Sequence, residues 1–168
     1  VGKCAGGSTI NALSNTFDKS TTRLIEYHVF DSNHILKQVI PQTTQSEHIH
    51  WVILTRDPLS RWISSFNWDY YTYAVKKRFY CHPKALKLFK NFNNCLTLAR
   101  EIAKGNEQAV LLSRFNHLTY GHMAMGQAWY LNRNLIESLS PSRTSLIRTE
   151  NIANDLRTGI AKINTHFG

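Results

Sequence analysis

Two stretches of this chain combine residue types that bind phosphate-like anions. The first is Lys3-Cys4-Ala5-Gly6-Gly7-Ser8-Thr9, in which a lysine precedes two glycines and two hydroxyl residues. Consecutive glycines let the backbone bend tightly and bring its N–H groups close to a ligand. The apolar spacing through Leu13 and Phe17 predicts a following helix, which Ser8 or Thr9 can cap. Because a helix N-terminus attracts anions, the stretch predicts an anion loop, with a flexible glycine-rich segment as the alternative.

The second stretch is Arg56-Asp57-Pro58-Leu59-Ser60-Arg61-Trp62-Ile63-Ser64. Arginine grips a phosphate through two parallel hydrogen bonds, and a serine hydroxyl two helical turns later can donate to the same group. Pro58 fits the first turn of a helix that carries Ser64. The alternative is that Arg56 pairs with a neighbouring carboxylate and Ser64 is simply exposed.

The elements that must position these stretches alternate along the chain. Strands are predicted at residues 24–30, 49–55 and 144–149, the second being apolar enough to be buried on both faces. Helices are predicted at 10–17, at 35–39 with Pro41 as a stop, after Pro58, and at 84–92, 95–104, 107–115, 127–139 and 151–163. This order predicts one α/β domain with a parallel sheet, in which ligands bind at the carboxyl ends of the strands.

Composition narrows the choice of partner. The 168 residues are 42% hydrophobic and carry a net charge of +9, which favours an acidic partner: a nucleotide, an anionic sugar or nucleic acid. The basic residues are scattered, so a nucleic-acid tail is disfavoured. No apolar run reaches the roughly 18 residues of a membrane span, and no signal-peptide pattern is present, so we expect a cytoplasmic protein. The cysteines, Cys4, Cys81 and Cys95, fit no metal spacing and are expected as free thiols, with a Cys81–Cys95 bridge as the alternative.

Together, the two stretches resemble the P-loop-like sulfotransferases, which use 3′-phosphoadenosine 5′-phosphosulfate (PAPS). That family has a Lys-x-x-Gly-x-(Ser/Thr) loop for the 5′-phosphosulfate and a later Arg-x-Pro-x-x-Arg-x-x-Ser segment for the 3′-phosphate. Both patterns occur here in that order, and the run from Ser145 to Asn151 looks like the family's late strand. Gly7 stands where many members have a hydroxyl residue, and no late Lys-Gly loop follows.

The resemblance implies a single three-layer domain over residues 1–168, with the P-loop NTPase-like sulfotransferase fold and no metal. Lys3 is then expected to be catalytic, stabilising charge on the leaving phosphate. Backbone amides of the loop and the Ser8 hydroxyl would hold the 5′-phosphate, and Arg56 and Ser64 the 3′-phosphate, helped by Arg61. The expected donor-binding residues are Lys3, Ala5, Gly6, Gly7, Ser8, Thr9, Arg56, Arg61 and Ser64. The acceptor is expected to be a hydroxyl or an amine, with carbohydrate as one class.

Sulfuryl transfer to a hydroxyl also needs a general base, and a histidine near its usual pKa of ~6.5 suits neutral pH. His28 is the first choice, because some carbohydrate sulfotransferases place a His or Glu between the two motifs. Glu26 and Asp31 are alternatives, and His28 can equally be a packed or surface histidine. The stretch from Trp68 to Tyr80 is rich in aromatic and basic residues and can either cradle an acceptor or supply core side chains.

The sequence disfavours one other function class and leaves a second one open. A kinase or NTPase is disfavoured, because the Walker pattern places its lysine after the glycines, whereas Lys3 precedes them. The predicted strand at 49–55 also lacks a carboxylate for Mg²⁺. A non-catalytic basic module that binds anionic glycan or nucleic acid through the same charge is the alternative to the enzyme.

Overall fold

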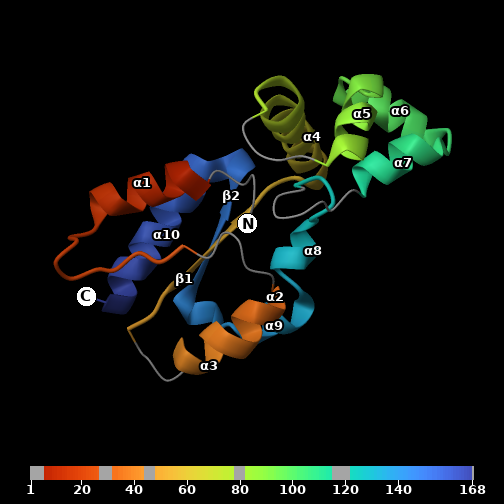
Figure 1. The fold of residues 1–168 in the computed structure, drawn as a ribbon. Coiled ribbons are helices and arrows are strands. Elements are labelled where there is room, and N and C mark those ends of the chain that lie inside the picture. The colour runs from red at the N-terminus through yellow and green to blue at the C-terminus, as the bar shows by residue number, and fades with distance from the viewer. Residues whose placement is uncertain (1–5, 27–31, 44–47, 78–81, 115–121, 168) are drawn as a thin grey trace. The chain divides into compact units, whose positions relative to one another are not determined.

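The computed structural model describes residues 6–26, 32–43, 48–77, 82–114 and 122–167 (Figure 1). The α-helices are α1 (Gly6–Thr16), α2 (Ser32–His34), α3 (Ile40–Thr43), α4 (Pro58–Asp69), α5 (Pro83–Asn91), α6 (Cys95–Ala103), α7 (Glu107–Ser113), α8 (Gln127–Tyr130), α9 (Arg133–Ser138) and α10 (Ile152–Phe167). The strands are β1 (Trp51–Thr55) and β2 (Thr144–Arg148). Ile35–Val39 and Tyr70–Val75 are π-helical, and Pro141–Arg143 and Thr149–Asn151 form 3₁₀ turns. Contacts group the chain into two compact units, residues 1–57 with 127–168, and residues 58–126.

The first unit contains a parallel pair of strands. β1 and β2 run in register from Trp51 beside Thr144 to Thr55 beside Arg148. The strands predicted at 49–55 and 144–149 are therefore confirmed, each one or two residues shorter. The strand predicted at 24–30 is not formed over its described part, 24–26, and its remainder lies outside the described residues. Mostly helical structure around parallel strands is compatible with the predicted α/β class.

Helix α10 covers one face of this sheet. Gly159 allows the close approach, because a Cβ added there would lie 3.2 Å from Cδ1 of Ile147 and 3.4 Å from Cβ of Ser145. Neighbouring strands point their paired residues to the same side, so Leu54 of β1 shares this face with Ile147. Figure 1 shows α1 and α10 on one side of the strands, and α3 and α9 on the other.

The other side holds an apolar cluster of Ile35, Val39, Ile40 and Leu135, against which Trp51 packs. The prediction that Pro41 ends a helix after Val39 is wrong, because helical structure continues through Pro41 to the end of α3. The turn before it is wide, with the N–H of Ile40 donating to the carbonyl of Ile35. A proline ring clashes with the carbonyl four residues earlier in a regular α-helix, and a π turn relieves that clash.

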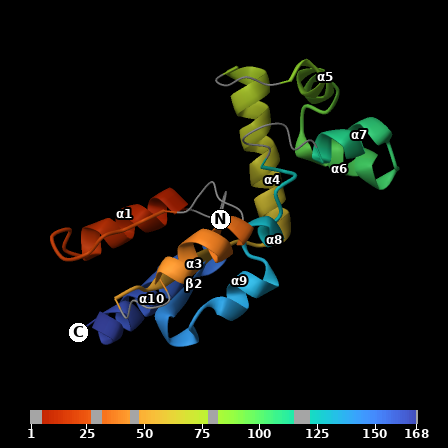
Figure 2. The same cartoon turned by 60° about the horizontal axis from the view of Figure 1, so that its bottom comes forward.

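The second unit is helical. Its core consists of Phe66, Tyr73, Leu88, Phe89, Phe92, Leu98, Ala109, Leu112 and Met123. Figure 2 shows α6 and α7 side by side. The helices predicted at 84–92, 95–104 and 107–115 are confirmed as α5, α6 and α7 within two residues at each end. Gly105, at φ +76°, follows α6 in the left-handed conformation that glycine favours.

The prediction of one helix over 127–139 is wrong in one respect, because two helices, α8 and α9, occupy this range. Asn132 stands between α8 and α9, and its side chain accepts the N–H of Leu135 at 2.9 Å. An asparagine that satisfies a free N–H in this way begins a new helix rather than continuing the old one. At the end of the chain, the helix predicted at 151–163 is confirmed and runs on to Phe167.

Candidate functional site

The described part of the glycine loop begins α1 and lies against β1. Lys3, Cys4 and Ala5 lie outside the described residues. A Cβ added to Gly6 would lie 3.2 Å from Oε1 of Glu26 and 3.7 Å from Cδ1 of Leu54. The first turn of α1 therefore sits beside the carboxyl-terminal half of β1, two residues before Arg56. Gly7 has open space around it, with no atom within 4 Å of an added Cβ.

The two hydroxyl residues of the loop lie inside α1, so the prediction that either one caps the helix is wrong. α1 already begins at Gly6. Ser8 is exposed, whereas Thr9 is only 1% exposed and lines a cavity of about 960 Å³ between α1, β1, α9 and α10. Oγ1 of Thr9 is enclosed and has no hydrogen-bond partner among the described residues.

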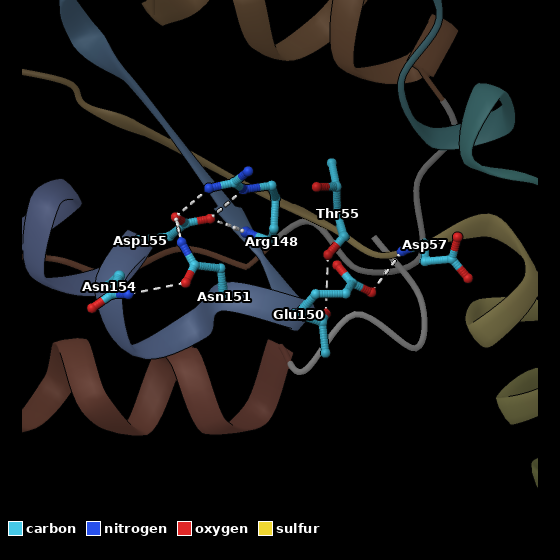
Figure 3. Close-up of polar contacts among 8 residues, drawn as sticks. Thr55, Asp57, Arg148, Glu150, Asn151, Asn154 and Asp155 are labelled. Carbon is cyan, nitrogen blue, oxygen red and sulfur yellow. Dashed lines mark hydrogen bonds and ion pairs between the residues drawn. The ribbon is translucent and has the colours of Figure 1, made fainter.

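The backbone around Arg56 is fixed on both sides at the carboxyl end of β1. Nε2 of Gln127 donates to the carbonyl of Arg56, and the N–H of Asp57 donates to Oε1 of Glu150 at 2.7 Å. Figure 3 shows this second contact beside Thr55, whose carbonyl accepts the hydroxyl of Thr149 at 3.0 Å. The predicted position of Arg56, directly after a strand, is confirmed, and its side chain is half-buried. An arginine with a fixed backbone is a suitable anchor for an anion.

Glu26 is the described candidate for the general base in this unit. Its carboxylate lies next to Gly6, at the N-terminal end of α1. His28 and Asp31 lie outside the described residues, so their places relative to the loop stay predictions. A carboxylate at a helix N-terminus interacts favourably with the helix dipole and occupies the same kind of position as a bound anion.

Arg61 and Ser64 belong to the second unit. Ser64 is half-buried on α4. Arg61 is only 3% exposed, and its Nη2 donates to the carbonyl of Met125 and, at 3.4 Å, to that of His122. The guanidinium thus fastens residues 122–125 onto α4. It is engaged by backbone carbonyls in this conformation.

A buried polar stripe continues along the same face of α4, through Ser65 and Asp69. Oδ1 of Asp69 lies 2.7 Å from Nδ1 of His122, and the two side chains are 3% and 10% exposed. Burial raises the pKa of Asp69, while the hydrogen bond from His122 opposes this rise. Asp69 belongs to neither of the two predicted anion motifs. The spacing of Arg61, Ser65 and Asp69, four residues apart, was the available signal.

Other histidines have separate partners. Nε2 of His50 lies 2.9 Å from Oγ of Ser145, at the end of the sheet opposite Arg56. Burial, with smaller effects from Lys162 and His166, lowers the pKa of His50 to about 4. Nδ1 of His82 accepts the N–H of Lys84 and begins α5. These side chains serve the fold rather than either anion motif.

The aromatic residues in the stretch that begins at Trp68 lie partly in the core and partly at the surface. Tyr73 is buried in the core, whereas Trp68 and Tyr71 are 41% and 50% exposed. Nζ of Lys76 lies 5.6 Å from the centre of the Tyr71 ring. Among the described residues of the stretch, Tyr73 therefore belongs to the core, whereas Trp68 and Tyr71 lie at the surface.

Over the described parts of the chain, no three His, Cys, Asp or Glu side chains gather as a metal site requires. None of the described helices combines the length and apolar character needed to cross a bilayer. Cys95 is a free thiol, and Cys4 and Cys81 lie outside the described residues. No family model, curated protein or solved structure matches the chain.

Proposed function

We propose that this chain is a sulfotransferase that moves the sulfuryl group of PAPS to a hydroxyl or amine acceptor, with carbohydrate hydroxyls as the first class to test. The observation that carries the proposal is the occurrence of both anion motifs in order, Lys3 to Thr9 and Arg56 to Ser64. Its support from geometry is that α1 begins within the first motif and β1 ends directly before the second.

Within the first unit, the described part of the loop lies beside the strand end that carries Arg56. A Cβ added to Gly6 would lie 3.7 Å from Cδ1 of Leu54, and hydrogen bonds from Gln127 and to Glu150 hold the backbone on either side of Arg56. Parallel sheets bind ligands at this edge. The arrangement suits a nucleotide whose 5′-group meets the N-terminus of α1 and whose 3′-phosphate meets Arg56.

Charge and positioning would supply the catalysis. Sulfuryl transfer resembles phosphoryl transfer in that a dispersed anionic group moves in line between two oxygens. Lys3 would stabilise the negative charge that develops on the leaving phosphate, and the loop amides would hold that phosphate. The sulfuryl group carries less charge than a phosphoryl group, so the step does not depend on a metal.

Calorimetry with three nucleotides tests the binding half of the proposal. PAP, AMP and ATP share the adenosine 5′-phosphate, and PAP alone carries a 3′-phosphate. We expect PAP to bind more tightly than AMP and ATP. Tighter binding of ATP, strengthened by Mg²⁺, would overturn the proposal in favour of metal-nucleotide chemistry.

Arg56→Ala tests the assignment of the 3′-phosphate. Loss of a charge-assisted contact costs about 1.5–3 kcal/mol, so PAP affinity should fall about 10- to 100-fold while AMP affinity changes little. Arg157→Ala removes an exposed arginine from α10 in the same unit and is the matched control. An unchanged preference for PAP over AMP in Arg56→Ala would remove Arg56 from the site.

Transfer of ³⁵S from PAPS to a panel of sugars, phenols and amines tests the catalytic half. We expect label in at least one acceptor, and its loss in Lys3→Ala, with Lys19→Ala as the control. The net charge of +9 supports the competing basic module. Binding of anionic glycan or nucleic acid without PAP preference and without transfer would favour that module.

A further inference from the structure

The charged residues of the chain are distributed unevenly. Residues 70–100 contain seven of the 20 Lys and Arg residues and none of the 11 Asp and Glu residues, so this segment carries a net charge of +7. The rest of the chain has 13 basic and 11 acidic residues, a net charge of +2. The whole segment lies in the second unit. Most of the excess positive charge therefore belongs to the helices of that unit, where it attracts anions.

Helix α5 exposes three lysines from this segment on one side. The buried side chains of α5 are Ala85, Leu88 and Phe89. Lys84, Lys87 and Lys90 are exposed, and their spacing of three residues makes them neighbours on the helix surface. They form a row about 9 Å long, facing away from the core. No carboxylate in the described part of the chain forms an ion pair with any of the three, so the charge of this lysine row is not neutralised there.

Two side-chain amides adjoin the lysine row. Asn91 is one helical turn after Lys87, and its Nδ2 donates to Oε1 of Gln108 on α7 at 3.3 Å. Both residues are exposed. Oδ1 of Asn91 and Nε2 of Gln108 form no hydrogen bond to another described residue, which leaves one acceptor and one donor beside the lysines. This pair of groups matches a hydroxyl, which can both donate and accept.

A row of exposed lysines suits a polymer better than a single ion. Each exposed charge is hydrated and screened by salt, so one contact contributes little. A linear polyanion makes several contacts at once and releases its counterions. The exposed side of α5 has no arginine to grip a phosphate at two points and no aromatic ring on which a base could stack. Lysines beside amides therefore favour a chain of acidic sugars over a nucleic acid.

We propose that the lysine row of α5 and the amide pair of Asn91 and Gln108 bind an acidic polysaccharide. The sulfate or carboxylate groups of the polymer lie at the lysines, and its hydroxyls lie at the two amides. No residue of either anion motif takes part, so this binding surface does not depend on the sulfotransferase function proposed above. Its affinity decreases steeply as the salt concentration rises.

Replacing all three lysines by glutamine, as Lys84→Gln, Lys87→Gln and Lys90→Gln in the full chain, tests the lysine row. Heparin is the probe, titrated at several salt concentrations. The slope of log affinity against log salt should decrease by about 2–3, since each lost contact removes about 0.7–0.9. Affinity at low salt should fall about tenfold or more. The thermal midpoint should hardly change, because these positions are exposed.

The matched control removes the same charge from exposed positions of the first unit. It combines Lys19→Gln, Lys37→Gln and Arg157→Gln. We expect the control to keep most of the affinity for heparin and most of the salt slope. Equal losses in the two triple variants would mean that overall charge attracts heparin, and would overturn the assignment to α5.

Two further measurements test the kind of polymer. Asn91→Ala combined with Gln108→Ala should weaken heparin binding and leave the salt slope unchanged, because the amides carry no charge. No loss in this variant would contradict the contact with hydroxyls. The unchanged chain should bind heparin more tightly than a single-stranded DNA oligomer of equal charge. Tighter binding of the DNA would overturn the polysaccharide in favour of nucleic acid, whatever the outcome of the PAPS experiments.

Discussion

The side chains of Arg148 and Asp155 form a two-point ion pair at the end of the sheet. Nε and Nη2 of Arg148 each lie 2.8 Å from an oxygen of Asp155, as Figure 3 shows. The backbone N–H of Arg148 donates to the same carboxylate at 2.9 Å. β2 thus ends, and α10 begins, around a single carboxylate. This contact fixes the turn that carries Glu150, which in turn holds the N–H of Asp57 beside Arg56.

Asp155→Asn should make the chain less sensitive to acid. The hydrogen bonds from Arg148, first from its side chain and then from its backbone, hold the pKa of Asp155 below its ordinary value. Since the folded-state pKa is lowered, the stabilisation is complete above the unfolded pKa of about 3.9 and is lost as pH falls below it. Denaturant midpoints measured from pH 5 to pH 2 should fall less steeply in Asp155→Asn. An equally steep fall in Asp155→Asn and in Glu137→Gln, an exposed control, would contradict this.

His50 should give a second acid transition, at higher pH. Its pKa is about 4 in the folded chain, lowered chiefly by burial, against about 6.5 when unfolded. The folded state therefore binds fewer protons, so stability is complete above about pH 6.5 and decreases as pH falls towards 4. His50→Gln can keep the bond to Ser145 and does not titrate. The free energy of unfolding of this variant should fall less between pH 6.5 and pH 4 than that of the unchanged chain. NMR titration of the unchanged chain should place the pKa of His50 at about 4.

Gly159→Val should destabilise the first unit. Its side chain would press on Ile147 and Ser145, which an added Cβ alone would approach to 3.2 and 3.4 Å. Overpacking of this kind costs about 1–3 kcal/mol. Ala161→Val places the same side chain at an exposed position of α10 and should cost less than about 1 kcal/mol. Equal losses of unfolding free energy in the two variants would mean that α10 does not pack closely on β2 at Gly159.

Arg61→Ala should lower the stability of the second unit without changing the preference for PAP over AMP. The guanidinium is buried and holds the carbonyls of His122 and Met125. Leaving these groups without their donor costs about 1–3 kcal/mol. Arg100→Ala, at an exposed position of α6, is the control and should have little effect. If Arg61→Lys lowers the preference for PAP over AMP while stability is kept, then Arg61 holds the 3′-phosphate instead.

Helix boundaries are predictable from the sequence where several local signals indicate the same boundary. Asn94 and Asn106 precede α6 and α7 and cap them, and Gly105 stands between these helices. Such signals act within a few residues, so they hold whatever the rest of the chain does. Asn132 carries the same signal, and the prediction of one helix over 127–139 did not use it. Pro41 gave the opposite error. The prediction ended a helix before it, whereas helical structure continues through Pro41 because the preceding turn is π-helical.

The candidate site was predictable only in its local parts. Arg56 follows an apolar strand, and that position could be predicted from neighbouring residues. Asp69 and His122 are 53 residues apart, and no local pattern joins them. Nor could the sequence assign Arg61 to backbone carbonyls, because an arginine in an anion motif and one that fastens a loop have the same spacing. Long-range hydrogen bonds are decided by packing.

One of the two units is formed from two separate segments of the chain, and this affects the order in which the units can fold during synthesis. The unit formed by residues 58–126 is continuous, whereas the other unit draws on residues 1–57 and 127–168. β1 leaves the ribosome well before its partner β2, so these two strands cannot pair until residues 144–148 have been made. The continuous unit, built from contacts between neighbouring helices, can fold earlier. Newly made chains therefore carry an apolar strand without its partner, and chaperones that bind such segments are expected to act on residues 51–55 first.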